Sequence, residues 1–294
     1  MLKRWIALIL FLAVALNAVG ALAHEPYMLY FAEMEPEDSA AGAIAWYFSD
    51  RVLEYTDHSL AVDVDTEGAL GDFDECLADM THRSEKVNIM RLSLAQLKEM
   101  GCEKLAVLAQ PGQFESHGQF LRFTQSDEGA KLLSEPNEKK LKLIGLCFLD
   151  LGFYQTAFRE SLSGLSDYAG RLIALESDAA AGAYQRLGAN TAALTAWADG
   201  TAAGIETSLA HYNQGGLPQE APWVGLDNHR MDISVLVIST ETWGLLTKLE
   251  KQLLTMAAQA TAEYSAEMME NFEARFADQA EGVHIVNVDP EAFR

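Results

Sequence analysis

The sequence predicts an α/β protein of two lobes that a long C-terminal helix connects. Two observations along the 294 residues support this prediction. Apolar runs with strand patterns alternate with segments of helical period, which is typical of a mainly parallel sheet. From Trp243, apolar residues recur in steps of three and four for about ten turns, and at about 1.5 Å per residue this helix would measure roughly 60 Å. A helix of that length is expected to cross from one lobe to the other.

The first half of the chain is expected to alternate strands with helices. Period-two or continuous apolar patterns indicate strands, and steps of three and four indicate helices. Pro36 and Pro111 end two of the strands, and Gly68 and Gly71 form a turn. The expected strands lie within 27–38, 59–66, 86–94, 104–111 and 138–153, and the expected helices within 40–56, 71–80 and 118–135.

The second half is expected to repeat this alternation. Strands are predicted within 171–177, 202–209, 232–239 and 283–289, and helices within 179–190, 191–200 and about 240–281. Gly188 and Asn190 stop the first of these helices. Ser239 is a plausible N-cap of the last one, with Glu241 in its first turn, and Gly282 ends it.

The segment from Met1 to Ala23 has the features of a secretory signal. It contains a basic start at Lys3 and Arg4, a long apolar run, and Ala-Leu-Ala before His24, which is the order of a cleaved signal peptide. A retained membrane anchor is the alternative, but the apolar run is close to the lower length limit for spanning a bilayer. We therefore expect cleavage before His24 and a periplasmic protein with no later membrane span.

Composition and motifs exclude several classes of function. The formal net charge is −22, and −24 without the signal segment, so the surface repels nucleic acid and anionic lipid. Cys76, Cys102 and Cys147 have irregular spacing, which leaves open one disulfide or three buried thiols. The sequence contains no Gly-rich phosphate loop, GxSxG, HExxH or CxxC motif. We expect no metal, no cofactor, no nucleic-acid partner and no enzymatic activity.

The order of motifs resembles the TRAP-type (tripartite ATP-independent periplasmic) solute-binding proteins, the DctP-like family, of which this chain would be a divergent member. The resemblance covers the mature chain and is most specific in the C-terminal quarter. There, HRMDISVLVIS is followed by Trp243, the long helix and VNVDPEAF. Weaker matches are Pro36-Glu37-Asp38, Ala69–Asp72, Gly152-Phe153, the spacing of Asp167, Gly170 and Ile173, and Gly200–Glu206.

The resemblance implies a two-lobed periplasmic binding-protein fold with hinge strands near Leu151 and Arg230 and a ligand cleft between the lobes. It implies a signal peptide at 1–23, lobe I at 24–151 and 231–255, and lobe II at 152–230 and 256–294. The implied function is that of a monomeric extracytoplasmic subunit of a TRAP-type secondary transporter, which captures a small organic solute and delivers it to membrane permease subunits. The alternative is a periplasmic ligand sensor or scaffold that has lost carboxylate binding.

Two departures from the family pattern concern the ligand. Family members hold a substrate carboxylate with arginines, whose planar guanidinium donates two parallel hydrogen bonds. The corresponding positions here are Tyr154 and Ala174. Arg91 and Arg159 are alternative carboxylate partners, although each could instead form a surface ion pair. The expected ligand is therefore neutral, cationic or aromatic.

The residues predicted to contact this ligand come from five segments of the chain. Glu206 has an alternative role as a structural hydrogen-bonding group near the hinge. The full set is Glu33, Ser93, Gln96, Tyr154, Ala174, Glu206 and Thr207.

Overall fold

A computed structural model describes residues 26–82, 86–214 and 216–294, so the expected signal segment and its cleavage point lie outside the described residues. Nine strands form one sheet in the order β2-β1-β3-β8-β4-β7-β5-β6, and β9 pairs with β8. The strands are β1 (Tyr27–Ala32), β2 (Leu60–Asp65), β3 (Ile89–Ser93), β4 (Leu143–Phe158), β5 (Leu172–Leu175), β6 (Asn190–Ala193), β7 (Gly204–Ser208), β8 (Trp223–Ser239) and β9 (His284–Asn287).

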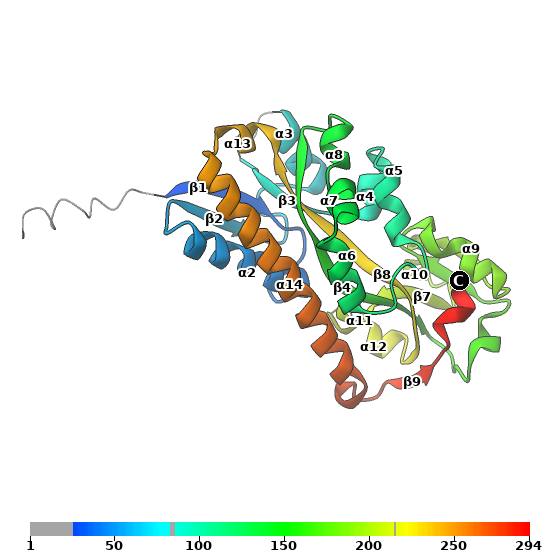
Figure 1. Cartoon of the computed structure of the whole chain (residues 1–294). Helices are drawn as coiled ribbons and strands as arrows, with labels where there is room; N and C mark the ends of the chain where they lie inside the picture. Colours follow the sequence, from blue (N-terminus) through cyan, green and yellow to red (C-terminus); the bar gives the residue numbers. More distant parts are fainter. Residues whose placement is uncertain (1–25, 83–85, 215) are drawn as a thin grey trace, which may run out of the picture.

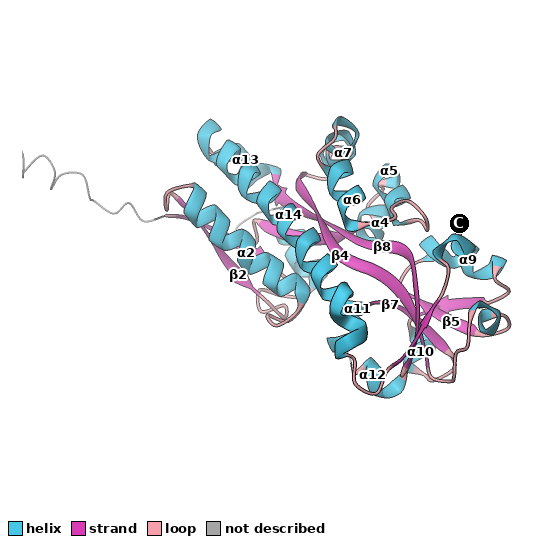
Figure 2. Cartoon of the chain, turned by 60° about the horizontal axis from the view of Figure 1, so that its bottom comes forward, coloured by secondary structure: helices cyan, strands magenta, loops and turns pink. Residues whose placement is uncertain are grey.

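Helices pack around this sheet, and the α/β class is confirmed (Figure 2). The α-helices are α2 (Ala40–Tyr55), α3 (Phe73–His82), α4 (Leu94–Glu99), α5 (Glu103–Ala106), α6 (His117–Thr124), α7 (Asp127–Leu133), α8 (Glu135–Glu138), α9 (Ala181–Arg186), α10 (Thr195–Ala198), α11 (Leu209–Gln214), α12 (Leu217–Glu220), α13 (Thr240–Leu245) and α14 (Lys248–Gln279). Four 3₁₀ turns are η1 (Val107–Ala109), η2 (Leu165–Tyr168), η3 (Asp178–Ala180) and η4 (Pro290–Phe293).

The described sheet is mixed: five of its eight strand pairs are parallel, in line with the expectation of a mainly parallel sheet, and three are antiparallel. β4 runs antiparallel to both β7 and β8, and β8 runs antiparallel to β3. The remaining pairs, β1 with β2 and β3, β5 with β6 and β7, and β8 with β9, are parallel. β4 and β8 are the two longest strands and cross the whole molecule side by side in opposite directions (Figure 1). They connect a half that contains β1–β3 to a half that contains β5–β7.

Two predicted elements differ in the structure. Residues 104–111, expected as a strand, form α5 and η1, in which Leu105 and Leu108 are buried at helical spacing. A short apolar run does not distinguish a strand from a buried helix. Residues 191–200, expected as a helix, begin with β6, because Asn190–Ala193 pairs with β5 in parallel register. Pairing with a neighbouring strand here overrides the helical preference of alanine.

Two predicted helices are each divided by a cap. The helix expected within 118–135 becomes α6 and α7, because Ser126 caps the second one by accepting a hydrogen bond from the amide of Gly129. The helix expected over about 240–281 becomes α13 and α14. Thr247 starts α14 with a capping box, in which its side chain and that of Glu250 each accept a hydrogen bond from the other's amide. The 32-residue α14 is then unbroken.

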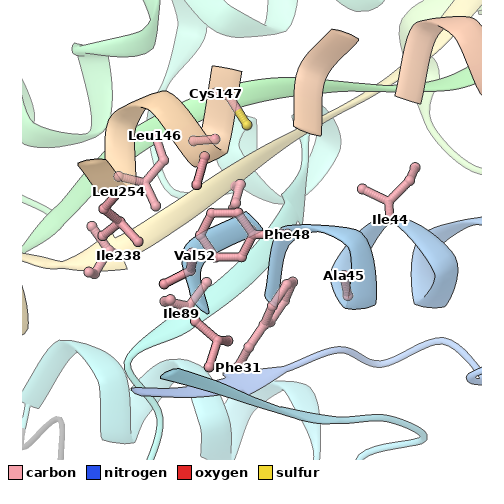
Figure 3. Packing of buried hydrophobic residues seen from close by; sticks show 14 of the residues in the cluster. Phe31, Ile44, Ala45, Phe48, Val52, Ile89, Leu146, Cys147, Ile238 and Leu254 are labelled. Carbon is pink, nitrogen blue, oxygen red and sulfur yellow. The ribbon is translucent and has the colours of Figure 1, made fainter. Parts of the chain in front are cut away.

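Helix α14 packs against both halves of the molecule, as the sequence predicts. Leu254, Ala258 and Ala262 belong to the core that α2 and β1 also form, whereas Phe276 belongs to a core with Tyr212 of α11. Figure 1 shows the helix running diagonally along the molecule. In the first core, Phe48 of α2 lies between Phe31 below it and the side chains above it (Figure 3).

Candidate functional site

Polar side chains from both halves of the molecule meet where strands of the sheet end. Glu33 follows β1, Glu176 follows β5, and His211 lies in α11 directly after β7. In α/β sheets, ligands bind outside the carboxyl ends of the strands. We call the whole group the cleft cluster, and it consists of Glu33, Glu35, Arg91, Tyr154, Glu176, Glu206, His211, Arg230, Asp232 and Ser234.

The first half of the molecule contributes a buried ion pair to the cleft cluster. Arg91 of β3 donates from Nε to Glu33 Oε2 at 2.8 Å and from Nη2 to Glu33 Oε1 at 2.6 Å. Its Nη1 donates to Ser234 Oγ of β8 at 3.2 Å. Glu33 and Arg91 are therefore close together, and the guanidinium is bound at all three nitrogens to protein groups.

The second half contributes a matching pair. Arg230 of β8 donates from Nε and Nη2 to the two oxygens of Glu206 at 2.8 and 2.6 Å. The guanidinium carbon lies 3.6 Å from the centre of the Tyr154 ring, which is a cation–π contact. Burial opposes ionisation of Glu206, but Arg230 and His229 lower the pKa of this carboxyl to about 2. Glu206 is thus a permanent anion with a dedicated counter-charge.

His229 extends this pair into the protein interior. Its Nε2 donates to Glu206 Oε1 and its Nδ1 to Asp227 Oδ1, both at 2.7 Å. Asp227 also accepts hydrogen bonds from Thr156 and Tyr168. Burial opposes protonation of His229, but the two carboxylates raise its pKa to about 9. Both oxygens of Glu206 bind cationic side chains of the protein. These contacts fit its alternative role as a structural hydrogen-bonding group better than a role in contacting the ligand.

His211 lies between acidic groups of the cleft cluster. Its Nε2 is 3.7 Å from Glu35 Oε1, and its Nδ1 is 3.9 Å from Asp232 Oδ2. The contact with Glu35 raises the pKa of His211, and the same contact lowers the pKa of Glu35. Tyr154 donates its hydroxyl to Glu176. His211 therefore links the segment after β1 to the middle of β8.

A cavity of about 690 Å³ opens between the two halves beside the cleft cluster. One wall consists of α4, α5 and η1, and the other of Glu176 to Ala179. Across it, Lys98 Nζ lies 2.7 Å from Asp178 Oδ1. Another hollow, of about 630 Å³, lies between α6, α7 and α14 and is lined by Trp243, Gln259 and Glu263 rather than by the cleft cluster.

The structure brings some predicted site residues into the cleft cluster and places others elsewhere. Ser93 and Gln96 form the capping box of α4, so their polar groups bond to each other's amides. Ala174 is fully buried in the second half. Thr207 alternates with Glu206 and Ser208 on β7, so its side chain points to the opposite face.

Arg159 lies away from the cleft cluster. It follows β4 and its amide donates to the carbonyl oxygen of Ala203, before the start of β7, whereas Glu206 and His211 of the cleft cluster lie within and after β7. Its guanidinium carbon is 3.7 Å from the centre of the Trp197 ring, and its Nη1 is 3.5 Å from Glu220. This arginine therefore contacts Trp197 and Glu220 in the second half of the molecule and does not belong to the cleft cluster.

Sequence reasoning missed Glu35, Glu176, His211, Asp232 and Ser234 as site residues, and it used Arg230 only as a hinge position. A signal was present in β8. Arg230, Asp232 and Ser234 alternate with apolar residues in a strand that is otherwise buried. Three polar residues at period two on a buried strand indicate one polar face in the interior.

Some expected absences can be compared with the structure. Within residues 26–82, 86–214 and 216–294, no group of three or more His, Cys, Asp or Glu side chains could hold a metal ion. Over the same ranges, no helix has the length and apolar character needed to span a membrane. Cys76, Cys102 and Cys147 are buried and free, so the described structure has three buried thiols rather than a bridge.

Comparison with solved structures shows the fold in other proteins. A TRAP periplasmic solute-binding protein from Ochrobactrum anthropi, with its C-terminus bound in the ligand-binding pocket, superposes with a TM-score of 0.80 at 21% identity, over 92% of this chain and 86% of that one. A TRAP periplasmic solute-binding protein from Polaromonas sp. JS666, bound to D-erythronate, superposes with a TM-score of 0.78 at 22% identity, over 91% of this chain and 90% of that one. Another from Pseudomonas aeruginosa PAO1, with bound L-malate, superposes with a TM-score of 0.78 at 20% identity, over 92% of this chain and 96% of that one.

A comparison with curated proteins finds no match. Residues 31–293 match the DctP family, described as bacterial extracellular solute-binding protein, family 7. This chain belongs to that family. It is a bacterial extracellular solute-binding protein of family 7, which confirms the DctP-like family that the sequence resembles.

Proposed function

We propose that this chain captures a small organic solute in the cleft between its halves and delivers it to the membrane subunits of a TRAP transporter. One observation carries the proposal: the cleft cluster combines side chains from both halves beside an open cavity, within a family of solute-binding proteins. Closure around a ligand at such a place would bury the ligand and change the surface shape of the protein. The family match favours this role over that of a sensor or scaffold.

The division into lobes follows from the same arrangement. We propose lobe I as residues 24–151 and 231–255 and lobe II as 152–230 and 256–294, with hinges near Leu151 and Arg230. β4 has a register shift between Asp150 and Phe153, and Gly152 there has φ +93, a backbone region that favours glycine. We also propose export with cleavage before His24 and a monomeric mature protein, which mass spectrometry and light scattering of exported protein would test.

The neighbours from Polaromonas and Pseudomonas carry organic acids, but the cations of this cleft cluster are already paired. Arg91 binds Glu33 and Arg230 binds Glu206 through two hydrogen bonds each. A carboxylate that replaced either glutamate would leave a buried anion without its partner, which costs several kcal/mol (about 3–5). We therefore propose a ligand that is neutral or cationic.

A thermal-shift screen against a metabolite library tests ligand capture. A solute that binds only the folded protein at about 100 times its Kd stabilises it by about 2.7 kcal/mol, which raises Tm by several degrees. Ala95→Trp places a bulky side chain in the cavity wall and should abolish the shift. The matched control is Ala78→Trp on α3, where Ala78 is exposed away from the cavity, and it should keep the shift. Absence of any stabilising solute, or equal shifts in both variants, would contradict the proposal.

A further inference from the structure

Asp232 is a buried carboxylate without a hydrogen bond in the described part of the chain. It lies in β8, its side chain is 8% exposed, and the nearest cation, His211 Nδ1, is 3.9 Å away. At that distance the contact is electrostatic and not a hydrogen bond. Buried carboxylates are normally paired or hydrogen-bonded, because an unpaired one loses its hydration without compensation. The carboxylate of Asp232 therefore lacks a donor.

Four charged groups act on Asp232. After burial, the strongest effect comes from Glu176, which follows β5 and lines the cavity, and it is repulsive. His211 of α11, Arg230 of β8 itself and Arg91 of β3 act in the opposite sense. Tyr154 of β4 joins this group because its hydroxyl donates to Glu176 and its ring lies under Arg230.

The nearby cations leave Asp232 uncompensated. Each arginine donates two hydrogen bonds to its own glutamate, and His211 is shared between Glu35 and Asp232. The cleft cluster contains five carboxylates and, even with His211 protonated, three cations. The charge that is missing is positive, and the side chain that lacks a partner is an acceptor. A donor with a positive charge satisfies both conditions.

We propose that Asp232 binds the ammonium group of an amine-bearing solute, with Glu176 at the cavity wall attracting the same group. This inference rests on the proposed capture of a solute in the cleft and names the chemical class of that solute. The ammonium donates to Asp232, and the remainder of the solute extends past Glu176, the residue of the cleft cluster that lines the cavity of about 690 Å³, into that cavity.

The ionisation of Asp232 provides a second, independent readout. Burial, with repulsion from Glu176, raises the pKa of Asp232 to about 6, whereas an alkylammonium resembles lysine and stays charged to about pH 10. Apparent affinity scales with the fraction of competent protein, so between pH 5 and 7.5 amine affinity should rise about tenfold.

Calorimetric titration with three probes of equal chain length tests the proposal. Succinate has two carboxylates, 4-aminobutyrate has one carboxylate and one ammonium, and putrescine has two ammonium groups. We expect at least one of the amines to bind at least tenfold more tightly than succinate, with the rise between pH 5 and 7.5. Asp232→Asn should weaken amine binding at least tenfold and abolish its pH dependence. The control Asp63→Asn, at an exposed position on β2, should change neither.

The fold of the variants is checked by thermal unfolding, and Asp232→Asn should keep or raise Tm because it removes an uncompensated buried charge. If Asp232→Asn lowers Tm, Glu176→Gln at the exposed cavity wall tests the same subsite and should weaken amine binding by about threefold. Tighter binding of succinate than of both amines, or amine binding that neither substitution changes, would overturn the amine assignment while leaving solute capture intact. If none of the three probes binds although other members of the library raise Tm, equal Tm shifts by organic acids and by amines would also overturn the amine assignment. Failure of the whole library would instead contradict solute capture itself.

Discussion

At the scale of single residues, Glu206 binds two cationic side chains at once. Both of its oxygens accept from Arg230, and one also accepts from His229, with all three side chains buried. A buried network in which each member is satisfied fixes one geometry, whereas the removal of one partner leaves a charge without compensation. We infer that this network connects β8 to β7 across β4, which lies between them in the sheet.

Replacement of Glu206 by glutamine should therefore destabilise the protein strongly. The change keeps the side-chain shape but leaves Arg230 buried without its counter-charge, and we expect a loss of about 3 kcal/mol in the free energy of unfolding. Urea denaturation at pH 7 measures it. Glu270→Gln, at an exposed position of α14, is the control and should stay within about 0.5 kcal/mol of the wild type. Equal midpoints for the two variants would show that the pair contributes little.

At the scale of elements, a second buried histidine connects three of them. His117 of α6 donates from Nδ1 to Asp150 of β4 at 2.7 Å and from Nε2 to Glu273 of α14 at 3.0 Å. Glu273 also accepts from the amide of Phe153, just after the register shift in β4. The helix that packs against both halves is thus attached to the bend of a central strand.

This network predicts a pH dependence of stability. Burial opposes protonation of His117, but Asp150 and Glu273 raise its pKa to about 10. A raised pKa means that the stabilisation is complete below the unfolded value of about 6.5 and is lost as pH rises towards 10. His117→Gln should lower the free energy of unfolding by about 2 kcal/mol or more at pH 6 and by much less at pH 10. Urea denaturation at both values measures the difference.

The free energy of unfolding of the variant must be compared with that of the wild type at each pH. His229 also has a raised pKa, so its own contribution to stability is lost as pH rises in both proteins. The exposed His58 has φ +64, which asparagine tolerates. His58→Asn should therefore show the pH profile of the wild type. A His117→Gln curve that runs parallel to the wild type from pH 6 to 10 would contradict the assignment.

At the scale of the whole molecule, two of the contacts across the cleft in the described residues are exposed polar pairs. Lys98 and Asp178 form an ion pair, and Gln214 donates to the carbonyl oxygen of Asp38. Exposed ion pairs contribute about 1 kcal/mol or less. Such contacts favour closure only weakly, so the solute must supply most of the energy that holds the halves together.

Reversal of one of these charges should shift the balance towards the open form. Lys98→Glu places two like charges across the cavity and should weaken solute binding by about threefold to tenfold, because fewer molecules are in the closed form. The matched control is Lys104→Glu, whose partner Glu138 lies on the same side of the cavity. Small-angle scattering without solute should show a larger radius of gyration for Lys98→Glu only. Identical affinities for both variants would exclude this role for the pair.

The sequence by itself determined the α/β class, the strand of 232–239 that precedes the long helix, and the family, because periodicity and motif order are local properties of the chain. It located the end of α14 well but not its buried face. Of the predicted apolar stripe, Leu246, Ala257 and Phe276 are buried, but most other members are half-buried and Leu249 is 62% exposed, whereas Leu254, Ala258, Ala262 and Ser265 outside the stripe are buried. Small side chains let the helix lie close to β4. A pattern of large apolar residues does not reveal this close packing, because the residues that make it are small.

Only the tertiary structure decided the composition of the cleft cluster. Glu33 and Arg91 are 58 residues apart, and Glu206 and Arg230 are 24 apart, yet each pair is joined by two hydrogen bonds. Which carboxylate meets which arginine depends on strand order, and this order places β8 between β3 and β4 by antiparallel pairing that alternation of elements cannot reveal. The chemistry of a side chain is visible in the sequence, but its partner, and therefore whether its charge is free for a solute, is set by the folded arrangement.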